Sequence, residues 1–354
     1  MTVTTDGLLL LKCGFKIPKI RIVLLDLNSK LCQEWKQNIS DFNSTSYSTE
    51  TDLEWLGVPV ELKVHQGTFE SFSESLPMDY IERYNPSVTD CTHFTQNIKS
   101  SKSRGVTTIV SPGNSLGYLG GGFDKAIAEM FMTGSDWKST ERYLQKKLLN
   151  RFNGYLTPSN ANLIEFNSQE YYEKSKSWNL LRCNSILHLP TMRIPKPLLI
   201  SEYSNSNNSD YKNIQNYYKN TDLRKWLAFV FDCTWEILST VNLANLKVLK
   251  WKDDRHAIID TIIIPGIGTG YGNLPVDTVA KAMVSAITIF LNCKLISLEK
   301  SIYSLRFLGE DFKQLIKDDE LDDKLNLEKP NSVLPGPSNG TYDPLIDSLK
   351  VLYG

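Results

Sequence analysis

The segment 110–124 holds the residues best suited to chemistry, because an apolar run there breaks into glycines and then restarts as a helix-forming stretch. Three consecutive glycines, Gly120, Gly121 and Gly122, let the main chain approach a ligand with no Cβ in the way. The first free N–H groups of the following helix, and the positive end of its dipole, would face this glycine loop. A phosphate group placed there would find hydrogen-bond donors already aimed at it.

A second unit of the same kind lies far downstream. The apolar run 261–264 leads through Pro265 into a second glycine-rich loop over 266–272, and apolar residues at helical spacing follow over 276–287. Two such units predict two phosphate-binding loops that face one cleft. The sequence contains neither the phosphate-binding Gly-x-x-x-x-Gly-Lys-Ser/Thr motif nor a dinucleotide-binding Gly-x-Gly-x-x-Gly with its acidic partner.

Asn114 and Asp124 are the polar side chains that flank the first loop. Asn114 can contact a ligand, or it can cap a turn by bonding its own backbone. Asp124 opens the predicted helix, where the dipole favours a carboxylate whatever the function.

His188 lies in the apolar run 186–189, and strand alternation places it on the opposite face from Leu187 and Leu189. A histidine in such a run is either a structural residue with its hydrogen bonds satisfied, or an acid, base or nucleophile in phosphate transfer. Its reference pKa near neutrality suits the second role. The residues alone leave both interpretations open.

These motifs resemble those of the macrodomains, a family that binds ADP-ribose. Asn114, the three glycines, Phe123 and Asp124 match the first loop of the family in order and spacing, and 266–271 resembles its second, pyrophosphate-binding loop. The segment 187–195, together with a Ser-Pro-x-Asn-Ser first loop, is similar to a divergent branch, the fungal ADP-ribose 1''-phosphate phosphatases. The resemblance runs from about residue 19 to about residue 294.

The resemblance implies a three-layer α/β/α fold around a central mixed, mostly parallel sheet. It implies that Asn114 and Asp124 lie at the distal ribose and that His188 lies near the phosphate end of the cleft, all three as catalytic residues. It implies no cofactor and no metal ion. The residues that it implies for ligand contact are Gly67, Thr68, Phe69, Ser111, Gly120, Gly121, Gly122, Phe123, Gly266, Ile267, Gly268, Thr269, Gly270 and Tyr271.

The sequence departs from the family at Thr68. Macrodomains commonly follow the glycine equivalent to Gly67 with an aspartate that accepts a hydrogen bond from the adenine amino group. A threonine hydroxyl can accept that bond, but without the charge assistance that strengthens it. Phe69, Phe123 and Tyr271 could compensate by stacking, so adenine selectivity stays undecided at this stage.

The elements that must position these residues alternate between strands and helices. Strand-like runs span 20–25, 60–64, 106–110, 186–189 and 261–264. Helical patterns span 28–35, 124–131, 141–152, 223–238 and 276–287, with Asn28 or Ser29 as a candidate cap for the first of them. This alternation predicts a largely parallel sheet covered by helices on both faces, with a ligand site at the carboxyl ends of its strands.

The composition is typical of a soluble intracellular protein. A hydrophobic content of 41% can bury a large core, and a formal net charge of −1 gives no global field that draws in nucleic acid or a membrane. The six cysteines are scattered without a C-x-x-C pair, which argues against zinc and against a disulfide framework. The apolar cluster 8–11 is too short to span a membrane. We expect a cytoplasmic or nuclear location, and the sequence indicates no particular oligomeric partner.

The chain divides into an N-terminal extension over 1–18, a macrodomain over 19–298 and a C-terminal extension over 299–354. The C-terminal extension is first acidic and then rich in Pro, Gly and Ser, and it is assigned no function. Polar segments near 73–103 and 201–221 are expected to be surface insertions, since their composition favours disorder.

The resemblance implies a phosphoric monoester hydrolase that converts ADP-ribose 1''-phosphate, a by-product of tRNA splicing, to ADP-ribose and phosphate. The glycine loops would hold the phosphates, Asn114 and Asp124 would position the distal ribose and water, and His188 would assist the leaving group. One alternative is an ADP-ribosyl hydrolase acting on modified proteins or on acetyl-ADP-ribose. The other is a non-catalytic module that only binds ADP-ribose.

Overall fold

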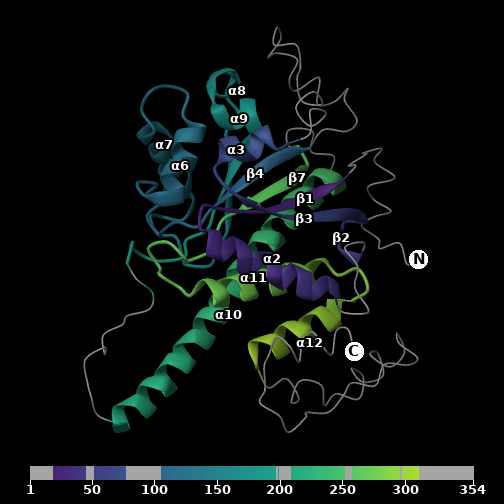
Figure 1. Ribbon diagram of the computed structural model, residues 1–354. Helices are drawn as coiled ribbons and strands as arrows, with labels where there is room; N and C mark the ends of the chain where they lie inside the picture. Colours follow the sequence, from purple (N-terminus) through teal and green to yellow (C-terminus); the bar gives the residue numbers. More distant parts are fainter. Residues whose placement is uncertain are drawn as a thin grey trace.

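The described residues form a seven-stranded sheet at the centre of the protein, shown by the computed structural model in Figure 1. The structure describes residues 19–44, 52–76, 105–196, 198, 209–251, 257–295 and 297–310. From one edge of the sheet to the other, the strands are β2 Glu54–Trp55, β3 Val58–Gln66, β1 Ile20–Asp26, β7 Ile259–Ile264, β4 Val106–Ser111, β6 Cys183–His188 and β5 Asn162–Glu165.

The sheet is mixed and mostly parallel, as the sequence predicts. Strand β1 pairs in parallel with β3 and β7, and β4 pairs in parallel with β7 and β6. The edge strands β2 and β5 run antiparallel to their neighbours. Because the five inner strands are parallel, their carboxyl ends lie side by side at the same end of the strands. Segments distant in the sequence come together there.

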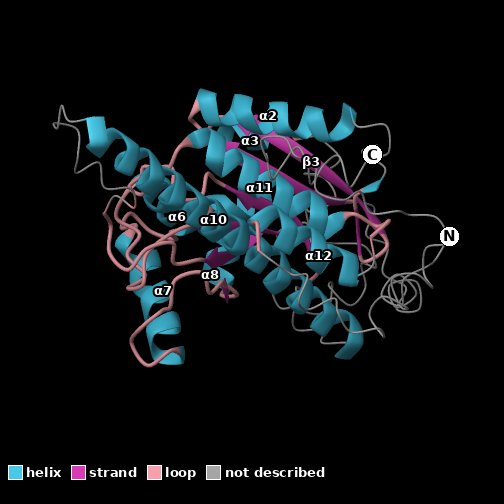
Figure 2. Ribbon diagram, turned by 90° about the horizontal axis from the view of Figure 1, so that it is seen from below, coloured by secondary structure: helices cyan, strands magenta, loops and turns pink. Residues whose placement is uncertain are grey.

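Helices cover both faces of the sheet and complete three α/β/α layers (Figures 1 and 2). One face carries α2 Ser29–Ser44, α10 Ser209–Trp251, α11 Val276–Leu291 and α12 Ser297–Leu308. On the opposite face lie α3 Phe69–Glu74, α6 Gly122–Phe131, α7 Lys138–Arg151, α8 Gln169–Lys174 and α9 Lys176–Leu181. The architecture confirms the predicted fold class.

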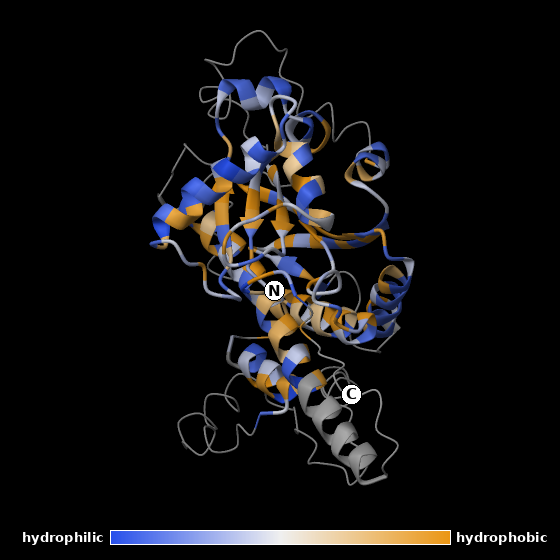
Figure 3. Cartoon of the chain, turned by 90° about the vertical axis from the view of Figure 1, so that its left-hand side faces the viewer, coloured by the Kyte–Doolittle hydropathy of each residue, from blue (hydrophilic) through white to orange (hydrophobic). Residues whose placement is uncertain are grey.

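The inner strands read as continuous apolar runs because they are buried on both faces. Every residue of β4, β6 and β7 is buried. Figure 3 shows the strands in the hydrophobic colour and the outer helices in alternating hydrophobic and hydrophilic bands. Burial on both faces therefore explains why these three strands were recognisable from the sequence without any alternation.

The local predictions for the first helix and the strand before it are confirmed. Strand β1 ends at Asp26, and α2 begins at Ser29 with Asn28 just before it. The Asn28 side-chain oxygen accepts hydrogen bonds from the backbone N–H groups of Lys30 and Leu31, at 3.1 and 3.3 Å. Asn28 therefore caps α2. The short elements β2, β5, α3, α8 and α9 escaped prediction because segments of two to six residues carry too little periodicity.

Part of the polar segment 201–221 is helical, whereas its composition favours disorder. Residues 209–221 belong to α10, and residues 201–208 lie outside the described part of the chain. No glycine or proline occurs between Ser209 and Trp251, and Ser, Asn and Tyr are only weakly unfavourable in helices. The polar composition therefore did not prevent helix formation.

Residues Leu223–Val248 of α10 are long and apolar enough to cross a membrane, by length and composition alone. In the structure this segment packs against α11, and Val230, Cys233 and Ile237 are fully buried. Core helices of folded domains satisfy the same length and composition test. One side of this segment is therefore buried in the domain, while 39% of its apolar window is buried in total.

Helix α12 crosses the boundary that the sequence suggests at residue 298. Phe307 is buried, and its ring stacks on Phe231 of α10 with the ring centroids 5.0 Å apart. The packed unit therefore continues past residue 298. Residues 1–18, 77–104 and 311–354 lie outside the described part of the chain, and with them the N-terminal extension, most of the 73–103 segment and most of the C-terminal extension.

Candidate functional site

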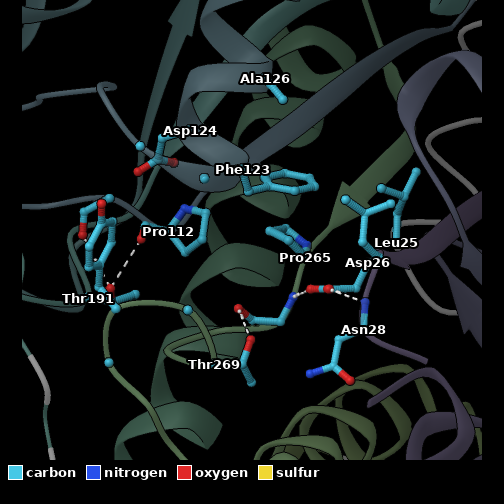
Figure 4. A pocket seen from close by; sticks show the side chains of 18 of the residues that line it. Leu25, Asp26, Asn28, Pro112, Phe123, Asp124, Ala126, Thr191, Pro265 and Thr269 are labelled. Atoms are coloured by element: carbon cyan, nitrogen blue, oxygen red, sulfur yellow. Dashed lines mark hydrogen bonds between the residues drawn. The ribbon is translucent and has the colours of Figure 1, made fainter. Parts of the chain in front are cut away.

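A cavity of about 800 Å³ lies at the carboxyl ends of the parallel strands. The segments that follow β1, β3, β4 and β7 form its walls (Figure 4). The structure brings most of the predicted site residues together there. Those that line it are Gly67, Thr68, Phe69, Asn114, Gly120, Gly121, Gly122, Phe123, Asp124, Gly266, Gly268, Thr269, Gly270 and Tyr271.

Three predicted site residues do not line this cavity. Ser111, His188 and Ile267 are each 0% exposed. The side chain of Ile267 belongs to the hydrophobic core. Ser111 and His188 end the paired strands β4 and β6 and lie behind the cavity wall. The structure therefore assigns none of the three a direct side-chain contact with a ligand in this cavity.

Sequence reasoning missed several residues of the cavity wall. Asp26, the last residue of β1, and Asn28, two residues further on, line it at the strand ends where a ligand was expected. Their position after a recognisable apolar strand was a signal that could have identified them. Lys176, at the start of α9, also lines the cavity, and nothing in the sequence pattern marked it.

The Asn114 side chain holds the first loop in shape. Its oxygen accepts hydrogen bonds from the backbone N–H groups of Leu116 and Tyr118, at 3.1 and 3.3 Å, and its amide nitrogen donates to the Tyr118 carbonyl at 2.9 Å. This is the turn-capping interpretation of Asn114. Because the residue also lines the cavity, the same interactions fix the wall that a ligand would meet.

Helix α6 begins at the glycine triplet. Gly121 is its N-cap residue, and no side chain caps the free N–H groups of the first turn. These donors, together with the positive end of the helix dipole, favour an anion. The first loop therefore leaves backbone donors of α6 available to an anion, while phosphate binding there stays a prediction.

The second loop is braced by β1 and reaches across to the first. The Gly266 N–H donates to the Asp26 carboxylate at 3.2 Å, and the Thr269 hydroxyl donates to the Gly266 carbonyl at 3.2 Å. Tyr271 is 63% exposed, yet a Cβ added at Gly121 would lie 2.9 Å from its ring. The two glycine loops thus approach each other closely at Gly121, where a side chain would displace the Tyr271 ring.

A buried hydrogen-bond network lies behind the first loop. The Ser111 hydroxyl lies 2.8 Å from Asp124 Oδ1 and 3.2 Å from His188 Nδ1. The other ring nitrogen, His188 Nε2, lies 3.1 Å from the Asn114 carbonyl oxygen. Protein groups therefore occupy both nitrogens of His188, and Asp124 and Asn114 are the members of the network that line the cavity.

Burial moves the pKa values of Asp124 and His188 in opposite directions. Asp124 is half-buried as a residue, but protein atoms surround its carboxyl group, and this desolvation raises its pKa to about 7. A hydrogen bond from Ser111 opposes that rise in part. Burial lowers the pKa of His188 to about 4, against a smaller effect of its bond to Asn114. Near neutral pH the histidine is uncharged and the carboxyl group is poised to exchange a proton.

A family model described as a macro-like domain matches residues 13–331. The chain belongs to this family. The match covers all of the described residues, including both glycine loops and the cavity between them. Membership in this family indicates that the protein binds or processes an ADP-ribose type of small molecule.

The macro-like domain has few basic side chains at its cavity. Among the described lining residues, Lys176 is basic and Asp26, Glu70, Asp124 and Glu129 are acidic. A polyanionic ligand must therefore be held mainly by backbone N–H groups and the end of α6. Figure 4 shows Asp124 and Asp26 at opposite ends of the cavity, with Phe123 and Pro265 between them. Within the described residues, no group of three or more His, Cys, Asp or Glu side chains could hold a metal ion.

Thr68 of the macro-like domain caps the short helix α3. Its hydroxyl oxygen accepts from the Ser71 N–H at 3.2 Å, and the Ser71 hydroxyl accepts from the Thr68 N–H at 3.0 Å. This reciprocal pair is a capping box. One lone pair of the threonine hydroxyl is thus already used, while the exposed side chain still lines the cavity.

Proposed function

We propose that this macro-like domain hydrolyses ADP-ribose 1''-phosphate to ADP-ribose and phosphate. The observation that carries the proposal is Asp124, a desolvated carboxyl group with a pKa of about 7 in the cavity wall, at the uncapped start of α6. A phosphate monoester bound at that helix end would lie beside a carboxyl group whose pKa of about 7 lets it give up a proton near neutral pH. Binding alone would not require such an acid.

The glycine loops would position the phosphates of the substrate in the cavity. The α6 N-terminus and the loop over 266–272 supply backbone donors for phosphates, and Asn114 fixes the wall beside the distal ribose. A water molecule attacks phosphorus, the bond from phosphorus to the ribose oxygen breaks, and Asp124 gives its proton to that oxygen. The products are ADP-ribose and inorganic phosphate, and Asp124 regains a proton from solvent.

His188 has a different role in this proposal from the one that the resemblance implies. Its ring is 0% exposed and both nitrogens contact protein groups, so it cannot touch a leaving group in the cavity. Protonation of the leaving oxygen therefore passes to Asp124, which lines the cavity.

The direct test measures phosphate released from ADP-ribose 1''-phosphate by the purified full-length chain, with and without a chelator. We expect release in both samples. Parallel assays with an ADP-ribosylated protein and with acetyl-ADP-ribose test the alternative, an ADP-ribosyl hydrolase, which would release ADP-ribose from these substrates. Calorimetry with ADP-ribose tests whether the protein only binds its ligand. Binding of ADP-ribose without turnover of any of these substrates would identify a non-catalytic module.

The pH dependence of turnover should follow Asp124. Burial raises the pKa of Asp124 to about 7, so the protonated acid dominates below that pH and is lost above it. The rate of phosphate release should therefore be high on the acid side and fall roughly tenfold per pH unit well above the pKa. A steady-state pH profile checks this, and a rate that rises through pH 7 would show that the ionised carboxylate acts as a base.

Thr68→Asp should increase selectivity for adenine. Aspartate is also a favourable N-cap residue, so α3 should keep its cap. The new carboxylate would accept a charge-assisted hydrogen bond from the adenine amino group, which favours ADP-ribose by about 1 kcal/mol, or roughly fivefold. Calorimetry should compare ADP-ribose with its inosine analogue, which lacks the amino group. Repulsion between the carboxylate and the diphosphate cancels in that ratio, and an unchanged ratio would place the base away from residue 68.

A further inference from the structure

A surface beside the cavity mouth combines exposed apolar side chains with basic ones. Three segments form it, namely 115–119 in the first loop, 151–156 at the end of α7, and 192–196 after β6. Backbone hydrogen bonds hold these segments side by side. The Ser115 N–H donates to the Met192 carbonyl at 2.9 Å, and the Leu156 N–H donates to the Ser115 carbonyl at 3.2 Å.

Large hydrophobic side chains lie exposed on this surface. Seven such side chains are exposed among the described residues, and four of them come from these three segments. They are Leu116, Tyr118, Tyr155 and Ile194, which are between 38% and 53% exposed. Tyr118 also lines the cavity, so the patch continues into the cavity mouth. Contiguous apolar patches on folded domains commonly mark binding sites.

The same three segments are positively charged. They contain Arg151, Arg193 and Lys196, all exposed, and no Asp or Glu. The Arg193 Nε–H donates to the Tyr155 hydroxyl at 3.2 Å, which holds a guanidinium group among the exposed rings. We call Leu116, Tyr118, Tyr155, Ile194 and the three basic residues the rim surface. Its chemistry fits an acidic segment that also carries apolar side chains.

The chain itself contains a segment with this chemistry. Residues 318–328 hold six acidic residues, three leucines and a single lysine, and they lie outside the described part of the chain. We propose that segment 318–328 docks on the rim surface of the same molecule. Its carboxylates would face the basic side chains, and its leucines would cover the exposed apolar ones. Docked there, it would cover part of the cavity mouth and compete with a ligand.

The described chain ends close enough to the rim surface for this docking. Phe307, near the end of α12, stacks on Phe231 of α10 with the ring centroids 5.0 Å apart. Two residues further along α10, Cys233 has Ser159 as a hydrogen-bond partner. Ser159 follows Tyr155 of the rim surface by four residues.

The length of the intervening chain is sufficient. The path from α12 to the rim surface crosses one helix, about 10–12 Å wide, and then four residues of at most about 3.6 Å each. Residues 311–322 lead from the last described residue to the centre of the acidic segment, and fully extended they span about 40 Å. The tether therefore reaches the rim surface within one molecule.

The first test applies a carbodiimide, which joins a carboxylate directly to a lysine amine, to the full-length protein without ligand. Peptide mass spectrometry of the monomer fraction should find Lys196 joined to acidic residues of 318–323. Lys138 is the control, since it is exposed at the other end of α7, about 20 Å from Arg151, and should not be joined to them. Absence of the Lys196 product would overturn the proposal. A product confined to dimers would also overturn it, and would assign the rim surface to a second copy.

The second test measures ADP-ribose affinity by calorimetry in the full-length chain. One variant combines Asp318→Asn, Asp319→Asn, Glu320→Gln, Asp322→Asn and Asp323→Asn. We expect it to bind at least about threefold more tightly than wild type, because a tethered competitor is removed. Salt at about 0.5 M should bring the two affinities together, since exposed charges are then screened.

A matched control removes the same number of charges elsewhere. It combines exposed acids of the described chain that do not line the cavity, which are Asp41→Asn, Glu74→Gln, Asp136→Asn, Glu170→Gln and Glu173→Gln. This control should leave the affinity near the wild-type value. An equal gain in both variants would reduce the effect to net charge and overturn the proposal.

A double-mutant cycle completes the test. The combination Arg151→Gln, Arg193→Gln and Lys196→Gln should raise ADP-ribose affinity in the wild-type chain and give no gain once segment 318–328 is neutral, because both changes break one contact. Additive gains would overturn the proposal. The cross-linking needs no ligand and no variant, so it decides alone if the variants do not fold. Failure of docking is thereby distinguishable from failure of ADP-ribose binding.

Discussion

Asp124→Asn should reduce phosphate release from ADP-ribose 1''-phosphate by about 10²–10⁴-fold while leaving ADP-ribose affinity within a few-fold of wild type. The amide has nearly the shape of the carboxyl group and cannot give up a proton to a leaving oxygen. Below pH 7 a neutral amide replaces a mostly neutral acid, so the charge of the cavity changes little. Steady-state phosphate release and calorimetry on the same preparation measure the two quantities.

The matched control for Asp124→Asn is Glu129→Gln. Glu129 lies on the same helix and lines the same cavity, but it is outside the network of Ser111 and His188. Loss of this carboxylate should change turnover only a few-fold. If Asp124→Asn kept more than about a tenth of the wild-type rate, proton transfer by Asp124 would be excluded as the main catalytic contribution. If it lost affinity and turnover in equal measure, Asp124 would be a binding residue.

Gly272→Ala should destabilise the second loop and weaken ADP-ribose binding at least tenfold. A Cβ at this position would lie 2.5 Å from the Gly268 carbonyl oxygen. That oxygen cannot move away freely, because it accepts a hydrogen bond from the Leu274 N–H at 3.0 Å. Gly268 itself has φ +77°, a conformation that favours glycine. Relief of the clash must therefore shift the backbone donors of the loop.

Gly270→Ala is the matched control for stability in the same loop. A Cβ at Gly270 would meet no atom within 4 Å, so its folded state should accept alanine. Thermal unfolding without ligand should show a loss of about 1–3 kcal/mol for Gly272→Ala and little change for Gly270→Ala. Equal melting temperatures for the two variants would mean that the loop rearranges without cost, and the argument for a rigid phosphate-binding loop would fail.

Local sequence patterns predicted the main strands and helices of the protein well. Strands β4 and β7 stood out as apolar runs, and the helices α6 and α11 that follow them stood out by composition and spacing. These elements are encoded over a few residues each, so no distant contact was needed to recognise them. The long helix α10 was underestimated because its N-terminal half is polar, although nothing in it breaks a helix.

The candidate site was predicted less completely, because its members come from different strands. Asp26 was overlooked, although its carboxylate braces Gly266 from a position 240 residues earlier in the chain. The orientation of His188 was also undecided. Strand alternation placed its ring opposite Leu187 and Leu189, but both faces of β6 are buried, so alternation could not tell cavity from core.

The sequence by itself determined the two glycine loops, the helix starts behind them and the presence of an acid at the first loop. Backbone freedom at glycine and the dipole of a helix act locally, so the order of residues suffices to reveal them. Only the tertiary structure decided that His188 points at Ser111 and Asn114 rather than at a ligand, and that Asp124 and Asn114 connect this network to the cavity. These roles depend on the parallel pairing of β4 with β6 and on burial, and burial is what sets the pKa values of both groups.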